Sequence, residues 1–260
     1  MADGDQPGER IARRLSRAGV CSRREAERWI VAGRVTVDGE KISTPAILVT
    51  ETSAITVDGK PVDAPRVTGL WLYHKPPGLV CTNRDPEGRP TVFDRLPRNL
   101  PRVMLVGRLD VASEGLLLLT NDGALARKLE LPATGWIRRY RVRVHGRPDE
   151  AALKKLEAGV TVEGVTYAPI RARIDSAQRS NAWLTLGLQE GRNREVRRVM
   201  EHLGLTVNRL IRTAYGPFQL GSLGRGEVRA VTGKVLREQI GKDAPGGEKP
   251  RRHKNAHRRR

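Results

Sequence analysis

Apolar residues recur at helical spacing near the start of the chain. Three of them, between Ile11 and Ala18, lie three or four positions apart, which predicts a short amphipathic helix. A second helix is predicted to follow, because Ser22 and Glu25 form a capping-box pattern and Gly33 follows the apolar residues. Two similar stretches, "RVTVDGEKI" and "AITVDGKPV", alternate strand residues around an Asp-Gly pair, and each predicts a β-hairpin.

The pattern becomes mixed after residue 67. "RRYRVRVHG" and "NAWLTLGL" alternate apolar and polar positions, which predicts half-buried strands. The leucines at 116–119 predict a fully buried strand that ends in a turn at 121–123. "LWLYHKPPGLVCT" predicts two strand pieces separated by a turn, and "REVRRVMEHLG" predicts a helix that ends at its glycine. Strands outnumber helices without alternating regularly with them, so we expect an α+β fold with a mainly antiparallel mixed sheet.

These patterns divide the chain into four parts. We expect a disordered polar tail at 1–8 and a small module of two helices and two hairpins at 9–66. A larger α+β domain is expected at 67–240. Residues 241–260 contain eight Lys/Arg against two acids and almost no apolar residues, so we expect them to form a disordered basic tail.

The net charge of the chain indicates which class of molecule it binds. The chain of 260 residues has a formal net charge of +19 and a pI of about 11.0. Such a field favours a polyanion, most often a nucleic acid. No apolar segment approaches the roughly 20 residues that span a bilayer, and no long amphipathic basic helix suggests a membrane surface. We therefore expect an RNA or DNA partner and no membrane.

Metal, disulfide and cofactor chemistry find little support in the sequence. Cys21 and Cys81 are far apart and form no CxxC pair, and the five histidines have no metal-ligand spacing. Nucleotide-binding glycine motifs and the GxSxG pattern of serine hydrolases are also missing. These observations predict no metal and no cofactor, and the cysteine usage predicts a reducing cytoplasm.

The stretch "VGRLDVASEGLLLLTNDG" sets an aspartate, Asp110, close to the buried leucines. Gly107 and Gly115 bracket the acid, which predicts tight turns on both sides. A carboxylate beside an apolar core needs a positive partner, or its pKa rises until it is protonated at neutral pH. From the residues alone, Asp110 either caps a turn or pairs with Arg108, or it takes part in catalysis.

Two family resemblances add to this picture. "LSRAGVCSRREAERWIVAGRVTVDG" resembles an S4 RNA-binding domain. "GRLDVASEGLLLLTNDG" resembles the catalytic motif of the RsuA/RluB family of pseudouridine synthases, and "HKPPG", "RRYRV" and "EGRNREVRR" resemble its other motifs in the same order. "NRDPEGRPTVFDRLP" is similar to the branch that acts on large-subunit ribosomal RNA. The resemblance extends from about residue 9 to about residue 231.

The resemblance implies catalytic roles for residues that match those motifs. Asp110 matches the catalytic aspartate, which attacks the uridine or takes a proton from its sugar. Tyr140 matches the active-site tyrosine that lies against the flipped uracil. Arg197 matches the arginine that pairs with the aspartate, and Arg108 matches the one that fills the gap left by the extruded nucleotide. The isomerisation implied needs no metal and no cofactor.

The resemblance also implies the partner. We expect a monomer that isomerises a uridine in 23S ribosomal RNA, either in the naked RNA or in a pre-ribosomal particle. A 16S RNA synthase and a noncatalytic S4-type RNA-binding protein are the alternatives. The remaining cations expected to contact RNA are Lys75, Arg192, Arg194, Arg198, Arg13, Arg17, Arg23 and Arg24.

Overall fold

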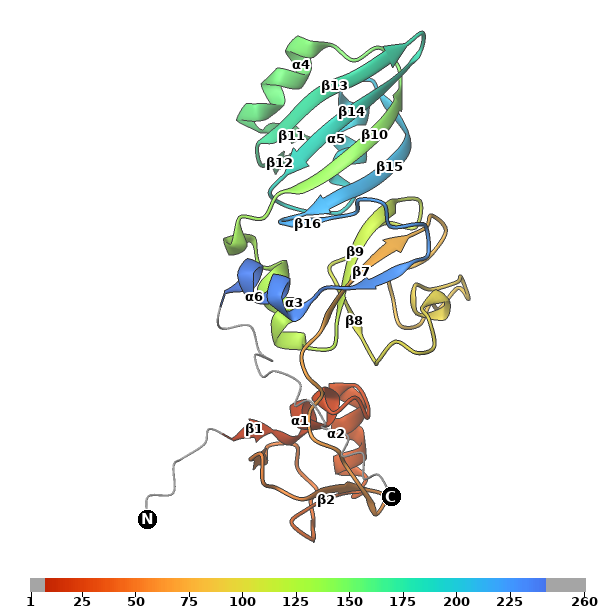
Figure 1. Cartoon of the computed structure of the whole chain (residues 1–260). Helices are drawn as coiled ribbons and strands as arrows, with labels where there is room; N and C mark the ends of the chain where they lie inside the picture. The colour runs from red at the N-terminus through yellow and green to blue at the C-terminus, as the bar shows by residue number, and fades with distance from the viewer. Residues whose placement is uncertain (1–7, 242–260) are drawn as a thin grey trace, which may run out of the picture.

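The structure, a computed structural model, describes residues 8–241 (Figure 1). The predicted tails at 1–7 and 242–260 lie outside these residues. A small first unit ends before the sheet strand β7. Its elements are β1 (Glu9–Arg10), α1 (Ile11–Arg17), α2 (Arg23–Val31), β2 (Val35–Val37), β3 (Glu40–Lys41), β4 (Leu48–Val49), β5 (Ile55–Val57) and β6 (Lys60–Pro61).

Local sequence signals account for this first unit. The Ser22 side chain accepts from the backbone of Glu25, and the Glu25 side chain accepts from the backbone of Ser22, so the predicted capping box is present. Both Asp-Gly pairs have positive φ at the two turn residues, as a type I′ hairpin requires. The two hairpins then pair through β2 and β5, and together they form one four-stranded sheet.

The second unit is built on a mixed sheet of nine strands within the described residues, with the order β13-β14-β10-β15-β9-β7-β17 along its main path. Its strands are β7 (Leu70–Lys75), β8 (Met104–Val106), β9 (Glu114–Thr120), β10 (Arg138–His145), β13 (Ile170–Gln178), β14 (Asn181–Leu188), β15 (Thr206–Tyr215), β16 (Phe218–Gln219) and β17 (Val228–Ala230). Strands β9 and β15 pair in parallel, and the other strand pairs are antiparallel. This is the expected α+β architecture.

Smaller elements cover the sheet. A separate pair, β11 (Val160–Val162) and β12 (Val165–Tyr167), lies near its outer end. The helices are α3 (Gly123–Glu130), α4 (Glu150–Lys155), α5 (Glu195–His202) and α6 (Gly233–Ile240), with short 3₁₀ turns η1 (Phe93–Arg95), η2 (Pro132–Thr134) and η3 (Leu156–Ala158). No helix within residues 8–241 is both long and apolar enough to cross a bilayer.

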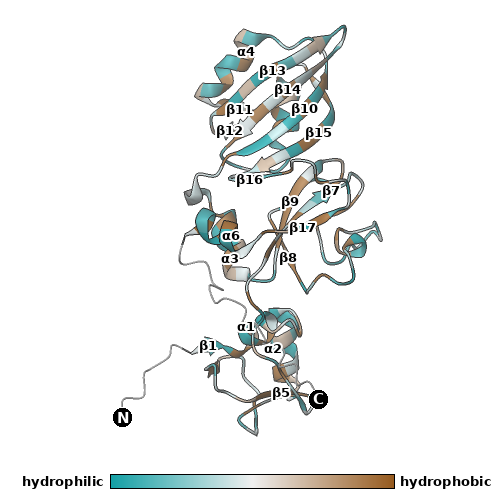
Figure 2. Cartoon of the chain, in the orientation of Figure 1, coloured by the Kyte–Doolittle hydropathy of each residue, from teal (hydrophilic) through white to brown (hydrophobic). Residues whose placement is uncertain are grey.

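Strand β9 explains the leucine run. All four leucines are 0% exposed, because β9 is packed on both faces. Leu117 and Leu119 belong to the core that includes α5, whereas Leu116 and Leu118 belong to a second core with α3 and α6. Figure 2 shows the resulting hydrophobic colour on β9. A strand buried on both faces reads as a continuous apolar run rather than an alternating one.

Gly115 lets β9 approach β15 closely. Its φ is +109°, and a Cβ there would lie 2.6 Å from the Arg212 amide nitrogen. Arg212 is the residue with which Gly115 is in register in the parallel pair. A side chain at this position would push the two strands apart, so the glycine is required by packing as well as by φ.

Two details differ from the sequence prediction. The piece after the Pro-Pro turn is not a strand, because only an isolated bridge joins Val80 to Thr91. The segment 121–123 does more than end β9: the Asp122 side chain accepts from the backbone amides of Ala124 and Leu125 and caps α3. The buried Asp122 also accepts from the Thr68 hydroxyl, a contact over 54 residues that no local pattern indicates.

Candidate active site

Asp110, the predicted catalytic residue, lies on the loop between β8 and β9 (residues 107–113), which we therefore call the catalytic loop. Its side chain is half-buried, and its carbonyl accepts from the backbone amide of Ser113 at 3.0 Å, which closes a turn. Gly107 and Gly115 have positive φ, as predicted from their positions on either side of the acid. The Gly78 amide donates to the Val111 carbonyl at 2.7 Å and ties the loop to the Pro-Pro turn.

Lys75 is buried against the catalytic loop and hydrogen-bonds to its backbone. It is the last residue of β7 and is 0% exposed. Its ammonium donates to the carbonyls of Asp110 at 3.2 Å, Val111 at 3.3 Å and Ser113 at 2.9 Å. Burial lowers the pKa of Lys75, and nearby negative groups that include Asp110 oppose this shift. The expectation that Lys75 contacts RNA is therefore corrected, since a buried ammonium that faces the loop has no surface for a phosphate.

Arg197 reaches the other side of the same loop from α5. Its Nη2 donates to the Ala112 carbonyl at 3.5 Å, and its Nη1 donates to the Val207 carbonyl at 3.1 Å. Burial lowers the pKa of Arg197, with a further contribution from Arg194, while the charge of Asp110 acts in the opposite direction.

The expected ion pair between Arg197 and Asp110 is not formed within the described residues. The guanidinium is close enough to Asp110 to feel its charge, but its hydrogen bonds go to backbone carbonyls. A strand, β15, supplies one of those carbonyls, and sequence spacing alone could not place it there. Arg108, the competing candidate, is exposed on the loop.

Tyr140 lies on the inner face of β10, as its alternating pattern predicts. The side chain is 9% exposed and packs in the same core as Leu109, the neighbour of Asp110. In the register, Tyr140 pairs with Arg212, and Arg212 pairs with Gly115. Two strand spacings, about 10 Å, therefore separate the Tyr140 backbone from the start of β9, where the catalytic loop ends.

Arg138 shares that inner face and is also buried. Its guanidinium donates to the Gln189 carbonyl at 2.6 Å and to the Tyr215 hydroxyl at 3.1 Å, and it lies over the Tyr215 ring. The Tyr215 hydroxyl in turn donates to the Leu129 carbonyl. The buried Arg138 guanidinium is thus satisfied by hydrogen bonds to neutral groups.

The segment before α5 carries exposed arginines, and the helix itself begins with a buried acid, Glu195. Arg192 pairs with Glu190 at 3.0 Å, and Arg194 has a left-handed φ of 51° at the start of the helix. Arg192, Arg194 and Arg198 are exposed, which is compatible with the predicted RNA contacts. Glu195 is 3% exposed, and burial raises its pKa to about 7, although the Arg192 amide donates to it at 2.9 Å.

Glu114 is a site residue that the sequence analysis missed. It follows the catalytic loop, is 3% exposed, and forms ion pairs with Arg209 and, at 2.8 Å, with Arg225. Burial alone would raise the pKa of Glu114, but the two arginines outweigh burial and hold it below its usual value. The only signal in the sequence is an acid directly before an apolar run, and its partners are 95 and 111 positions away.

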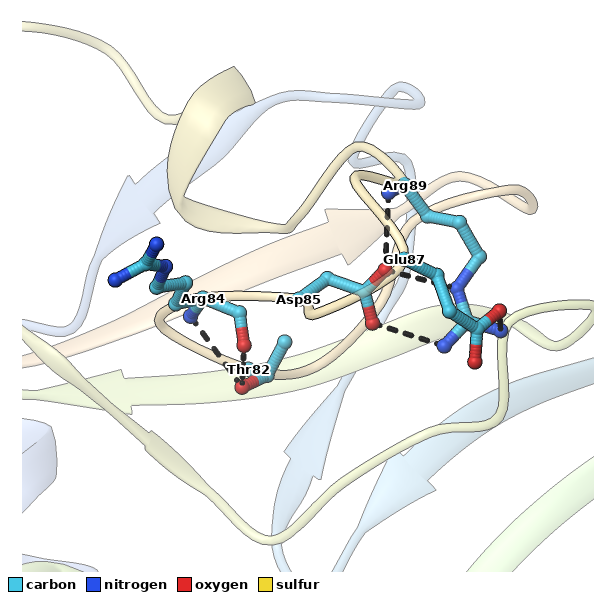
Figure 3. A network of polar contacts seen from close by, with 5 residues as sticks. All are labelled: Thr82, Arg84, Asp85, Glu87 and Arg89. Carbon is cyan, nitrogen blue, oxygen red and sulfur yellow. Dashed lines mark hydrogen bonds and ion pairs between the residues drawn. The ribbon is translucent and has the colours of Figure 1, made fainter.

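A polar loop, residues 82–89, overlaps the stretch that is similar to the large-subunit branch. Asp85 accepts from the Arg89 amide at 2.9 Å and from the Arg89 guanidinium at 2.8 and 3.0 Å (Figure 3). Arg89 also pairs with Glu87, while Arg84 points away from this cluster. These hydrogen bonds hold the pKa of Asp85 below its usual value. The loop is thus fixed by its own side chains.

The four arginines of the first unit that are predicted to contact RNA lie on its two helices. Arg13 and Arg17 both pair with Glu9, at 3.5 and 3.0 Å, and Arg23 and Arg24 are exposed. Their role in RNA binding stays a prediction. No group of three or more His, Cys, Asp or Glu side chains within residues 8–241 is arranged to hold a metal ion.

Comparison with known families agrees with this geometry. Residues 69–202 match the family described as RNA pseudouridylate synthase, and residues 9–55 match the S4 domain. The chain belongs to the RNA pseudouridylate synthase family and carries an N-terminal S4 domain. Members of this family are isomerases, so this chain is an RNA-modifying enzyme.

Particular relatives extend over most of the chain. An uncharacterized RNA pseudouridine synthase of Rickettsia prowazekii is 44% identical, over 89% of this chain and 97% of the relative. Ribosomal large subunit pseudouridine synthase B of Salmonella typhi is 46% identical, over 82% of this chain and 75% of the relative. A crystal structure of a pseudouridylate synthase covers 89% of this chain and 99% of its own, with a TM-score of 0.61 and 25% identity.

Proposed function

We propose that this enzyme isomerises a specific uridine to pseudouridine in 23S ribosomal RNA during maturation of the large subunit. The observation that carries the proposal is the half-buried Asp110 on a loop whose carbonyls are held by two cations, Lys75 and Arg197. Relatives from Salmonella typhi and Pasteurella multocida that are named for the large ribosomal subunit, at 46% and 44% identity, support 23S over 16S RNA.

The reaction breaks the bond between N1 of the uracil and C1′ of the ribose, and it forms a bond between C5 and C1′. The proton that leaves C5 is balanced by the proton that N1 gains, so the product is an isomer of the substrate. A carboxylate on a fixed loop can attack C1′ or remove a sugar proton, and both steps need Asp110 to be ionised. Lys75 and Arg197 hold the backbone of this loop through hydrogen bonds to its carbonyls, without a direct ion pair to Asp110.

The other side chains have separate tasks in this proposal. The Tyr140 ring lies on the inner face of β10 and stacks against the extruded uracil, and its hydroxyl handles the C5 proton. Arg108 is exposed on the catalytic loop and stacks in the gap that the uridine leaves in the RNA. The S4 unit and the exposed arginines 192, 194 and 198 bind the phosphate backbone.

Asp110→Asn tests the catalytic proposal. The amide keeps the shape of the side chain and removes its charge, so we expect pseudouridine formation to be abolished while RNA affinity stays within a few-fold. Ribosomal RNA from cells that lack the protein is incubated with the purified variant, and pseudouridines are mapped chemically. Asp63→Asn is the matched control, since Asp63 is exposed between the two units, and we expect it to act like the wild type.

The same mapping separates the alternatives. A new pseudouridine in 23S RNA with the wild type, and none with Asp110→Asn, supports the proposal. Modification of 16S RNA alone contradicts the assignment of the substrate. Turnover by Asp110→Asn at the wild-type rate contradicts the role of Asp110. The proposal further places the protein in the cytoplasm, as a monomer that acts on rRNA or on a pre-ribosomal particle.

A further inference from the structure

One face of the outer half of the sheet is rich in arginine. Strands β13, β14, β10 and β15 contain eight arginines and a single acidic residue, Asp175. Arg138 and Arg212 are buried on the inner side. The other six are exposed and form what we call the arginine face: Arg139, Arg141, Arg143, Arg171, Arg173 and Arg209.

Register places these arginines in rows across the strands. Arg139 is in register with Gly187, and Gly187 with Arg171. The next row holds Arg141, Thr185 and Arg173, and the row after it brings Arg143 level with Arg209. Because side chains that are two residues apart share a face, the arginines of β10 repeat about every 7 Å.

This face lies opposite the proposed active site. Tyr140, Val142 and Val144 project from β10 into the core with α5, so the alternate residues project the other way. Figure 1 shows α5 behind these strands. An RNA segment inserted at the catalytic loop therefore leaves most of the arginine face free, although Arg209 pairs with Glu114, the residue that follows the loop.

The chemistry of the face fits phosphate rather than bases. Trp183 is the aromatic residue in its middle, but Arg141 lies 4.6 Å and Arg209 lies 5.9 Å from its ring. The two guanidiniums occupy the ring surface on which a base would stack. Stacking also orders both arginines and reduces the entropy cost when they bind an anion.

A hollow beside this cluster adds space for an anion. Its volume is about 280 Å³, and its lining includes Arg139, Arg171 and Arg173 together with one acid, Glu157. Gly187 lies between Arg139 and Arg171 and has no side chain to fill the space between them. Neither Arg143 nor Arg171 forms an ion pair with any other described residue, so both guanidiniums remain available.

We propose that the arginine face binds the sugar–phosphate backbone of a second segment of the substrate RNA, on the opposite side of the sheet from the catalytic loop. This proposal rests on the proposed function, because it takes the occupant to be the same ribosomal RNA. Guanidinium contacts to phosphate oxygens position the RNA and do not read its sequence. The arginine face therefore contributes affinity and orientation, and the isomerisation step is left to the catalytic loop.

Arg143→Gln/Arg171→Gln tests the proposal in the full-length protein. Binding to 23S RNA transcribed in vitro is measured over a range of salt concentrations. Each phosphate contact contributes about 0.7–0.9 to the slope of log affinity against log salt, so the double variant is expected to reduce the slope by about 1.5. Single-turnover isomerisation at saturating RNA is expected to keep the wild-type rate, since neither residue belongs to the catalytic machinery.

Lys154→Gln/Lys155→Gln is the matched control. It removes two exposed positive charges from α4, which packs on the inner side of the same strands. The salt slope of the control is expected to stay within about 0.3 of the wild-type slope. This margin is smaller than the roughly 0.7–0.9 that one phosphate contact contributes. An unchanged slope in the arginine variant overturns the proposal, and it indicates that the face binds a protein partner instead of RNA. Equal reductions in both variants also overturn it, because only net charge then matters.

The experiment keeps this proposal separate from the proposed function. The salt slope is an equilibrium property and is measured whether or not the RNA is isomerised. Failure of the wild type to form pseudouridine in 23S RNA contradicts the proposed function alone. A wild-type rate together with an unchanged slope contradicts the arginine face alone.

Discussion

The Lys75 ammonium hydrogen-bonds to backbone carbonyls and forms no ion pair with a carboxylate among the described residues. A fully buried ammonium without partners would be costly, and here four carbonyl oxygens surround it, including that of Pro76 at 3.1 Å. Three of these carbonyls belong to the catalytic loop. We therefore expect Lys75 to be a positioning residue, which acts on the reaction through the geometry of Asp110.

Lys75→Met tests this role. Methionine fills a similar volume but leaves the carbonyls of the loop without a donor, which costs about 1–3 kcal/mol for each unsatisfied group. We expect a single-turnover rate roughly 100-fold lower, as for a catalytic group displaced by about 1 Å. RNA affinity is expected to stay unchanged, and the split between rate and affinity is the measurement that identifies positioning.

Lys128→Met provides the control for Lys75. The Lys128 ammonium also donates to a backbone carbonyl, that of Ile240 at 3.0 Å, but its side chain is exposed on α3. We expect wild-type rate and affinity from this variant. Weaker RNA binding by Lys75→Met with an unchanged rate would contradict the positioning role.

At the scale of elements, α5 joins the active site to the stability of the fold. Its inner residues Val199 and Met200 are fully buried, while Arg197 on the same helix reaches the catalytic loop. The helix begins at Glu195, whose buried carboxyl has a pKa of about 7 against an ordinary value of 4.5. Folding therefore depends on the protonation of a residue next to the site.

The sign of this dependence follows from where each state releases its proton. The unfolded chain releases the Glu195 proton near pH 4.5, and the folded chain retains it until about pH 7. The contribution of Glu195 to the free energy of unfolding therefore falls as the pH rises through this window, and it is constant above it.

Glu195→Gln removes the titration and keeps an acceptor for the Arg192 amide. We expect it to raise the free energy of unfolding at pH 8 by on the order of 2 kcal/mol and to flatten the pH dependence between about 4.5 and 7. Denaturant unfolding across pH measures both effects. Glu201→Gln, on the exposed side of the same helix, is the control. Identical pH profiles for Glu195→Gln and the wild type would refute the assignment.

At the scale of the whole molecule, positive charge is spread over several surfaces. The S4 helices and the arginine face carry it within the described residues, and the segment 242–260 carries a net +6 of the formal +19. Each of these parts lacks the catalytic motif residues. We therefore expect them to contribute affinity for RNA, whereas the catalytic loop supplies the chemistry.

Removal of residues 242–260 tests this division. The truncated protein is expected to have a smaller slope of log affinity against log salt, by about 0.7–0.9 for each phosphate that the segment binds, and an unchanged rate at saturating RNA. Removal of residues 1–7, which contain two acids and no Lys or Arg, is the control and is expected to leave the slope as it is. An unchanged slope after the first truncation would mean that the segment does not touch RNA.

Local interactions are what the sequence by itself determined. The capping box at Ser22 and the two Asp-Gly turns depend on residues within a few positions of each other. The alternation of β10 and the leucine run of β9 likewise showed which strands are half-buried and which are buried on both faces. The glycines on either side of Asp110 likewise predicted the turns of its loop, because they lie close to the acid in the chain.

Only the tertiary structure decided which distant groups meet around that loop. The sequence predicts that Lys75 is a loop cation that contacts RNA. The pairing of β7 with β9 instead buries it against the carbonyls of the catalytic loop. Arg197 was expected to pair with Asp110, but the position of α5 against β15 gives it the Val207 and Ala112 carbonyls instead. Charge and spacing along a chain do not specify such partners, because a buried cation is satisfied by whichever acceptors packing brings within hydrogen-bond distance.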